Sequence, residues 1–146
     1  MGKPNRRVDH PLEQQVVLEV VRTANELLQG TAELLKPHGL TNPQFNVLRI
    51  LRGAGPGLMC GEIAERMLTR DPDITRLLDR LEDRGLISRE RPEQNRRAVH
   101  ATITDPGRVL LAALDRPIER LHERQVGSLG AADLRRLLDL LQRARE

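Results

Sequence analysis

Apolar side chains recur at helical spacing along most of the chain. From Leu12 they fall three or four residues apart, the spacing of one helix face. This stripe comprises Leu12, Val16, Val20, Ala24, Leu27 and Leu28. Further apolar residues widen it beyond one face: Val17, Val21, Leu34 and Leu35. A long helix that is apolar on two sides must bury both, so we expect its second side to meet another subunit.

Three shorter helices are predicted between residues 41 and 85. The first begins at Thr41, which caps it in a capping box with Gln44. The second covers about residues 60–68. The third begins with Asp71 as N-cap and Pro72 in its first turn, and ends at Gly85. The tight turn between the second and third helices predicts a helix-turn-helix.

The pattern then changes to two short strands, residues 86–91 and 98–103, joined by a polar hairpin tip. Asp105 and Pro106 open another helix, which Pro117 is expected to kink or break near Asp115. A last helix carries an inward stripe of Leu134, Leu137, Leu138 and Leu141.

This order of elements predicts a mainly α-helical protein with a small β-wing. Residues 1–11 form a flexible basic arm, and residues 12–146 form a single domain. Within it, residues 41–104 make a winged helix-turn-helix lobe. Residues 12–36 and 105–146 supply the N- and C-terminal dimerisation helices.

The composition and the absence of certain motifs argue against several classes of function. No apolar run approaches the roughly 18 residues of a membrane span, and no secretory leader is visible, so a cytoplasmic protein is expected. No histidine spacing suits a metal, and no nucleophile–base motif or phosphate-binding glycine loop appears. We therefore expect neither an enzyme nor a cofactor. The lone Cys60 excludes an intrachain disulfide and is interpreted as a packing residue rather than a redox sensor.

Aromatic content and charge narrow the type of nucleic acid that the chain could bind. One Phe and no Trp or Tyr exclude stacking on unpaired bases, whereas a double-strand reader needs only charge and hydrogen-bond donors. The net charge is only +3, and residues 66–97 hold nine arginines against seven carboxylates. Helix surfaces that carry charges of both signs often only face solvent and bind no partner. The topology, more than the charge, therefore predicts binding to double-stranded DNA.

Candidate DNA contacts lie on the outer face of the third short helix, just before it and at the hairpin tip. The outer face can enter a major groove, and the tip can reach phosphates or a minor groove. The candidates are Arg70, Asp73, Thr75, Arg76, Arg80, Arg96 and Arg97.

Five short motifs carry a resemblance to a known family. They are LTNPQF (40–45), GEIAER (61–66), ITRLLDRLEDRGL (74–86), NRRAV (95–99) and TDPG (104–107). In this order and spacing, they resemble the multiple-antibiotic-resistance regulator (MarR) family. The resemblance implies a homodimer on a pseudo-palindromic operator, with residues 71–85 in the major groove and Arg97 in a minor groove. It also implies a repressor that a small aromatic or phenolic effector releases from DNA.

The chain departs from the family pattern at two positions. Asn95 stands where the wing usually carries an aspartate two residues before its arginine. Met59 replaces the usual Ser or Thr cap of the second short helix, which is expected to leave Glu62 without its capping-box partner.

An effector pocket and a second function remain open from sequence alone. The pocket candidates are Val16, Val20, His38, Phe45 and Leu48, and all of them except His38 suit a hydrophobic core equally well. The alternative function is a winged-helix module that binds another protein and does not read DNA.

Overall fold

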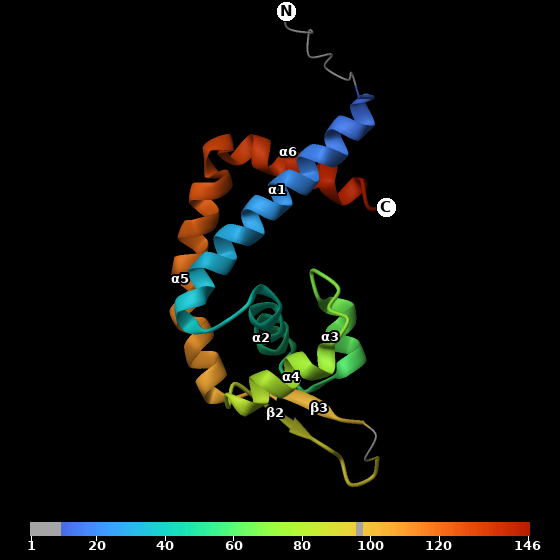
Figure 1. Cartoon of the computed structure of the whole chain (residues 1–146), viewed down its shortest axis with the longest axis vertical. Coiled ribbons are helices and arrows are strands. Elements are labelled where there is room, and N and C mark those ends of the chain that lie inside the picture. Colours follow the sequence, from blue (N-terminus) through green and yellow to red (C-terminus); the bar gives the residue numbers. More distant parts are fainter. Residues whose placement is uncertain (1–9, 96–97) are drawn as a thin grey trace, which may run out of the picture.

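Of the three long helices, α1 (Leu12–Leu35) and α6 (Gly130–Arg143) lie above a lobe of short helices and a small sheet, and α5 (Asp105–Val126) runs along the side of that lobe (Figure 1). This computed structural model describes residues 10–95 and 98–146. The lobe holds α2 (Asn42–Ala54), α3 (Cys60–Arg66) and α4 (Ile74–Asp83). No helix among these residues is long and apolar enough to span a membrane.

The sheet is antiparallel and has three strands in the order β1-β3-β2. The strands are β1 (Leu58–Met59), β2 (Ile87–Glu90) and β3 (His100–Ile103). Two 3-10 turns, Lys36–His38 after α1 and Gly127–Leu129 before α6, complete the chain. The expectation of a mainly helical protein with a small β-wing is confirmed. The strand β1 was not predicted, because two residues are too few to establish a period.

One core joins the lobe to the long helices. Its most deeply buried side chains come from α1, α2, α3, α4, β2 and α5: Leu35, Val47, Leu48, Leu51, Ile63, Leu81, Ile87, Leu111 and Leu114. Burying a leucine or isoleucine side chain contributes about 1.5–3 kcal/mol. Because Leu35 ends α1 and Leu111 lies near the start of α5, the core anchors one end of α1 and one end of α5 to the lobe.

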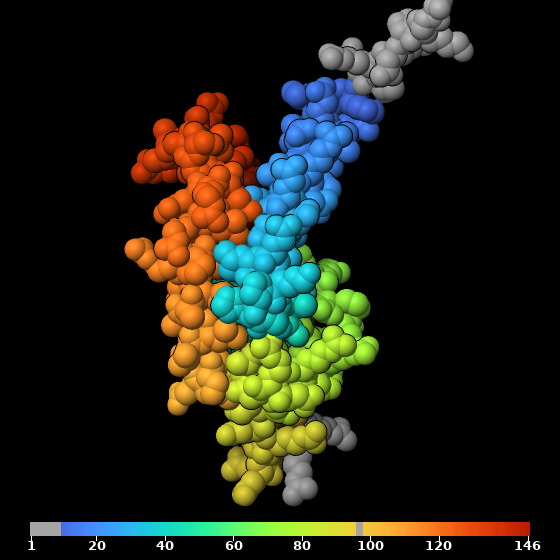
Figure 2. All heavy atoms as spheres, turned by 60° about the vertical axis from the view of Figure 1, so that its left-hand side comes forward, coloured from blue at the N-terminus to red at the C-terminus, as the bar shows by residue number. Residues whose placement is uncertain are grey.

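The remainder of α1 and all of α6 lie outside this core. Figure 2 shows α1 and the α5–α6 arm projecting away from the lobe. Their apolar side chains are exposed in the single chain: Leu12, Val16, Val17, Leu18, Val20, Val21, Leu28, Leu137, Leu138, Leu140 and Leu141. An apolar surface of this extent is typical of an interaction site rather than of a monomer.

Helix boundaries confirm some predictions and correct others. The Thr41–Gln44 capping box is present, and Gly85 closes α4 with a φ of 70°. However, α4 begins two residues later than expected, with Asp73 and not Asp71 as its N-cap. At α3 the Met59 side chain makes no cap hydrogen bond, as expected, but the Glu62 carboxylate still accepts a hydrogen bond from the Met59 backbone N–H at 3.0 Å.

Pro117 does not break α5, which runs without interruption from Asp105 to Val126. The buried stripe of this helix continues on both sides of the proline, through Leu111, Leu114 and Ile118. Packing of that stripe holds the helical path through the position where Pro117 lacks a backbone donor.

Candidate nucleic-acid interface

Local hydrogen bonds set the start of α4. The Asp71 carboxylate accepts from the Asp73 backbone N–H at 2.9 Å, which folds residues 71–73 into a turn. Asp73 then caps the helix by accepting from the Arg76 backbone N–H at 3.1 Å. The Asn46 side chain accepts from the Leu68 N–H at 2.8 Å and so ties the preceding turn to α2. These bonds fix the first turn of α4, where Thr75 and Arg76 lie.

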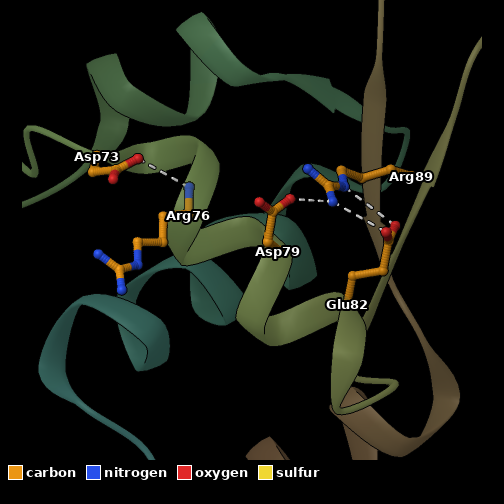
Figure 3. A network of polar contacts seen from close by, with 5 residues as sticks. All are labelled: Asp73, Arg76, Asp79, Glu82 and Arg89. Atoms are coloured by element: carbon orange, nitrogen blue, oxygen red, sulfur yellow. Dashed lines mark hydrogen bonds and ion pairs between the residues drawn. The ribbon is translucent and has the colours of Figure 1, made fainter.

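The hydrophobic face of α4 determines which side chains point outward. Leu77, Leu78 and Leu81 are buried in the core. On the opposite side, Thr75, Arg76 and Arg80 are exposed, as is Arg70 in the turn before the helix. Neither Arg76 nor Arg80 forms an ion pair within residues 10–95 and 98–146. Figure 3 shows the Arg76 guanidinium pointing away from the neighbouring carboxylates.

A polar network fastens α4 to the wing strand β2 (Figure 3). Arg89 of β2 forms ion pairs with two carboxylates of α4, Asp79 and Glu82. It donates through Nε to Glu82 Oε2 at 3.2 Å and through Nη2 to Glu82 Oε1 at 3.1 Å. This bidentate contact constrains direction as well as distance, so it fixes the wing base relative to the helix.

The network also changes the local electrostatics. The hydrogen bond from Arg89 holds the pKa of Glu82 below its ordinary value of 4.5, against the smaller opposing effect of burial. The two carboxylates in turn raise the already high pKa of Arg89. Asp79 and Glu82 would otherwise repel phosphates, and Arg89 neutralises part of that charge.

A cavity of about 620 Å³ lies between α4, the start of α3 and the sheet. Thr75, Asp79, Glu82 and Arg89 form part of its polar wall, and Cys60 also lines it. Cys60 is partly buried and free.

The structure brings together the candidates on α4 but not the whole predicted set. Asp73, Thr75, Arg76 and Arg80 share α4 and its cap, whereas Arg96 and Arg97 lie outside the described residues. Arg89 was not among the predicted residues, although its position on a predicted strand next to the acidic helix was a usable signal.

The five effector candidates do not line one cavity. Val16 and Val20 line an apolar groove of about 450 Å³ between α1 and α6, together with Leu137 and Leu141. Phe45 and Leu48 are buried in the lobe core. His38 is exposed at the end of α1.

Comparisons with known proteins agree with this geometry. The model of the MarR family matches residues 40–99. The HTH-type transcriptional regulator TtmR of Methylorubrum extorquens (strain PA1) is 33% identical over 115 residues, which cover 79% of this chain and 58% of that protein. The HTH-type transcriptional repressor Rv2887 of Mycobacterium tuberculosis is 30% identical over 109 residues, covering 75% of this chain and 78% of the relative.

Solved structures show the same similarity over nearly the whole chain. A MarR transcription factor from Planctomyces limnophilus is 40% identical, with a TM-score of 0.72 over 91% of this chain and 97% of that one. The structure of Rv2887 in complex with p-aminosalicylic acid is 26% identical, with a TM-score of 0.70 over 94% of this chain and 100% of that one.

Proposed function

This chain belongs to the MarR family, and we propose that it is a cytoplasmic, homodimeric regulator of transcription that binds double-stranded DNA at a pseudo-palindromic operator. The observation that carries the proposal is the exposed Arg76 on the capped α4, with no ion pair within the described residues. An arginine in this position is free to bind guanine O6 and N7 in a major groove. Thr75, Arg80 and Arg70 are proposed to contact neighbouring bases or phosphates.

The wing has a separate role in the proposal. Arg97, with Arg96 beside it, is assigned to the minor groove from the family resemblance, and Arg89 holds the wing base against α4. Arginine is attracted to narrow minor grooves by their negative potential, and such a contact depends on groove shape more than on a single base. Arg76 is therefore proposed to read sequence, and Arg97 to add affinity over many sequences.

The experiment compares Arg76→Ala and Arg97→Ala on one operator and its single-base variants, over a series of salt concentrations. Arg76→Ala is expected to weaken binding by about 1–3 kcal/mol and to relax the preference at one position in each half-site. Arg97→Ala is expected to weaken binding evenly and to flatten the salt dependence. The control is Arg116→Ala, an exposed arginine on α5 that pairs with Glu119 at 3.6 Å.

Two results would count against these assignments. If Arg76→Ala discriminates between bases at every operator position as well as the wild type does, Arg76 does not contact a base edge. If Arg97→Ala binds the operator with unchanged affinity and salt dependence, the wing does not contact DNA. That result would favour the alternative of a protein-interaction module.

We further propose that the protein is a repressor and that a small aromatic acid or phenol releases it from its operator. The support is similarity to Rv2887, a repressor whose structure contains p-aminosalicylic acid. Of the five candidates, Val16 and Val20 are kept as the proposed effector contacts, because they share the apolar groove between α1 and α6, whereas His38, Phe45 and Leu48 lie elsewhere. Titration of the protein–operator complex with p-aminosalicylate tests this proposal. We expect the acid to release the wild-type protein from DNA, and Val20→Ala to weaken that release. A complex that persists at saturating p-aminosalicylate would contradict this choice of effector class.

A further inference from the structure

The end of α4 meets the ends of two long helices at one junction. After α4, Arg84 keeps a helical conformation and Gly85, with a φ of 70°, turns the chain toward β2. The Arg84 guanidinium extends away from its own helix to the connection between α1 and α2. Its Nη1 donates to the Gly39 carbonyl at 2.6 Å, and its Nη2 donates to the His38 carbonyl at 3.0 Å.

The connection is shaped to receive this side chain. Gly39 has a φ of 67°, and a Cβ built there would lie 3.4 Å from Arg84 Nη2, so the guanidinium lies directly against the glycine backbone. The accepting carbonyls follow the C-terminal end of α1, where a helix dipole favours a cation. Arg84 forms no ion pair with a carboxylate in the described part of the chain.

The same end of α4 is bonded to the start of α5. Thr104, the N-cap of α5, donates through its hydroxyl to the Gly85 carbonyl at 2.6 Å. Its backbone N–H donates to the Leu86 carbonyl at 3.1 Å. A Cβ on Gly107 would lie only 2.3 Å from the Leu86 carbonyl oxygen, so the first turn of α5 rests on the chain that leaves α4.

We propose that Arg84 is a positioning residue, which fixes the direction of α4 relative to the long helices and thereby the spacing of the half-sites that the dimer accepts. This rests on the proposed function. Apolar packing of α4 through Leu77, Leu78 and Leu81 holds the helix against the lobe, but such packing is non-directional. The two bonds of Arg84 have fixed geometry, since a guanidinium is a rigid planar fork. They therefore set an angle that packing alone leaves free.

A first measurement needs no DNA. Spin labels on Asp83→Cys, in a Cys60→Ser background, report the distance between the two α4 helices of the dimer by pulsed electron resonance. Arg84→Gln is expected to broaden this distance distribution, and Arg84→Lys to broaden it less, because an ammonium keeps the charge without the two directed bonds. The lysine variant also provides a folded alternative if Arg84→Gln does not fold.

The matched control is Arg52→Gln. Arg52 makes two hydrogen bonds to Asp115, both at 2.9 Å, and so joins α2 to α5 without touching α4. Its loss should lower the melting temperature and leave the distance distribution unchanged. Equal broadening in both variants, or no broadening in Arg84→Gln, would overturn the positioning role.

The second measurement uses operators with identical half-sites and one base pair added or removed between them. The wild type is expected to discriminate between these spacings, and Arg84→Gln to reduce the discrimination by about threefold to tenfold. Unchanged discrimination would contradict the proposal. If the wild type binds no duplex, the proposed function fails, while the distance measurement still decides whether Arg84 positions α4.

Discussion

At the residue scale, three arginines at the end or on the surface of one helix–strand unit have three different environments. Arg76 is exposed and forms no ion pair with the described residues, Arg89 lies between two carboxylates, and Arg84 donates to two backbone carbonyls. Only the first keeps its full hydrogen-bonding capacity for DNA. The partner that an arginine already has, rather than its formal charge, therefore decides what it can recognise.

The ion pairs of Arg89 predict a pH-dependent stability difference. Arg89→Gln leaves Asp79 and Glu82 as like charges one turn apart, so the free energy of unfolding at pH 7 should fall by about 1 kcal/mol. Because the pKa of Glu82 is lowered in the folded protein, this ion pair contributes to the free energy of unfolding above pH 4.5. The contribution disappears as the pH falls through the folded pKa of Glu82. Urea unfolding of wild type and variant at pH 7 and in acid checks this.

The control for that experiment is Arg91→Gln, an exposed arginine next to β2 with no ion pair in the described regions. It should change stability little at either pH. A difference between wild type and Arg89→Gln that stays constant, or grows, as the pH falls would show that the pairing with Glu82 is not its source.

Cys60 is expected to act as a packing residue. It is partly buried at the start of α3 and forms no disulfide. Cys60→Ser should therefore leave the affinity for the operator within a few-fold of the wild-type value. Binding assays with and without peroxide test this, and release from DNA that peroxide causes only in the wild type would instead identify a redox sensor.

At the element scale, the sequence predicted helices with unambiguous end signals and failed where the signals competed. Thr41 and Gln44 form the only plausible box at the start of α2, and the box is present. Before α4, both Asp71 and Asp73 could cap. The Asp71 side chain binds the Asp73 N–H instead, so the helix starts later than predicted. Proline usually breaks or kinks a helix, but tertiary packing of α5 outweighs this tendency at Pro117.

Contacts between elements were harder to predict than the elements themselves. The outward face of α4 follows from its leucine spacing, so Thr75, Arg76 and Arg80 could be placed from sequence. The pairing of Arg89 with Asp79 depends on how β2 is oriented against α4, and the reach of Arg84 to Gly39 spans 45 positions. No local pattern encodes the second of these contacts.

The start of α3 offers a stabilising substitution. Glu62 already accepts from the Met59 N–H, but the Met59 side chain makes no cap hydrogen bond. Met59→Thr supplies the missing hydroxyl acceptor and suits the extended backbone of β1, so the free energy of unfolding should rise by about 1 kcal/mol. Chemical denaturation measures it, and Met59→Val serves as the control with the same shape and no acceptor. If Met59→Thr and Met59→Val change the free energy of unfolding equally, the missing side-chain cap does not limit the stability of α3.

At the scale of the whole molecule, the exposed apolar surfaces of α1 and α6 predict an obligate dimer. Val20 and Leu137 both line the groove between these helices, and the side chains around them remain exposed in one chain. Val20→Glu or Leu137→Glu should therefore reduce dimer and folded protein together. Sedimentation and circular dichroism measure both quantities. Val109→Glu, at a position 70% exposed near the start of α5, is the control. A folded wild-type monomer at micromolar concentration would contradict the prediction.

The central claim is that a symmetric pair of α4 helices reads a specific duplex sequence. The most direct test is selection of bound sequences from a random double-stranded DNA library by the folded wild-type protein. The account predicts enrichment of an inverted repeat, whose half-site centres lie about one helical turn, or a small multiple of it, apart. A library that remains unenriched after repeated rounds, or a motif without two-fold symmetry, would contradict it.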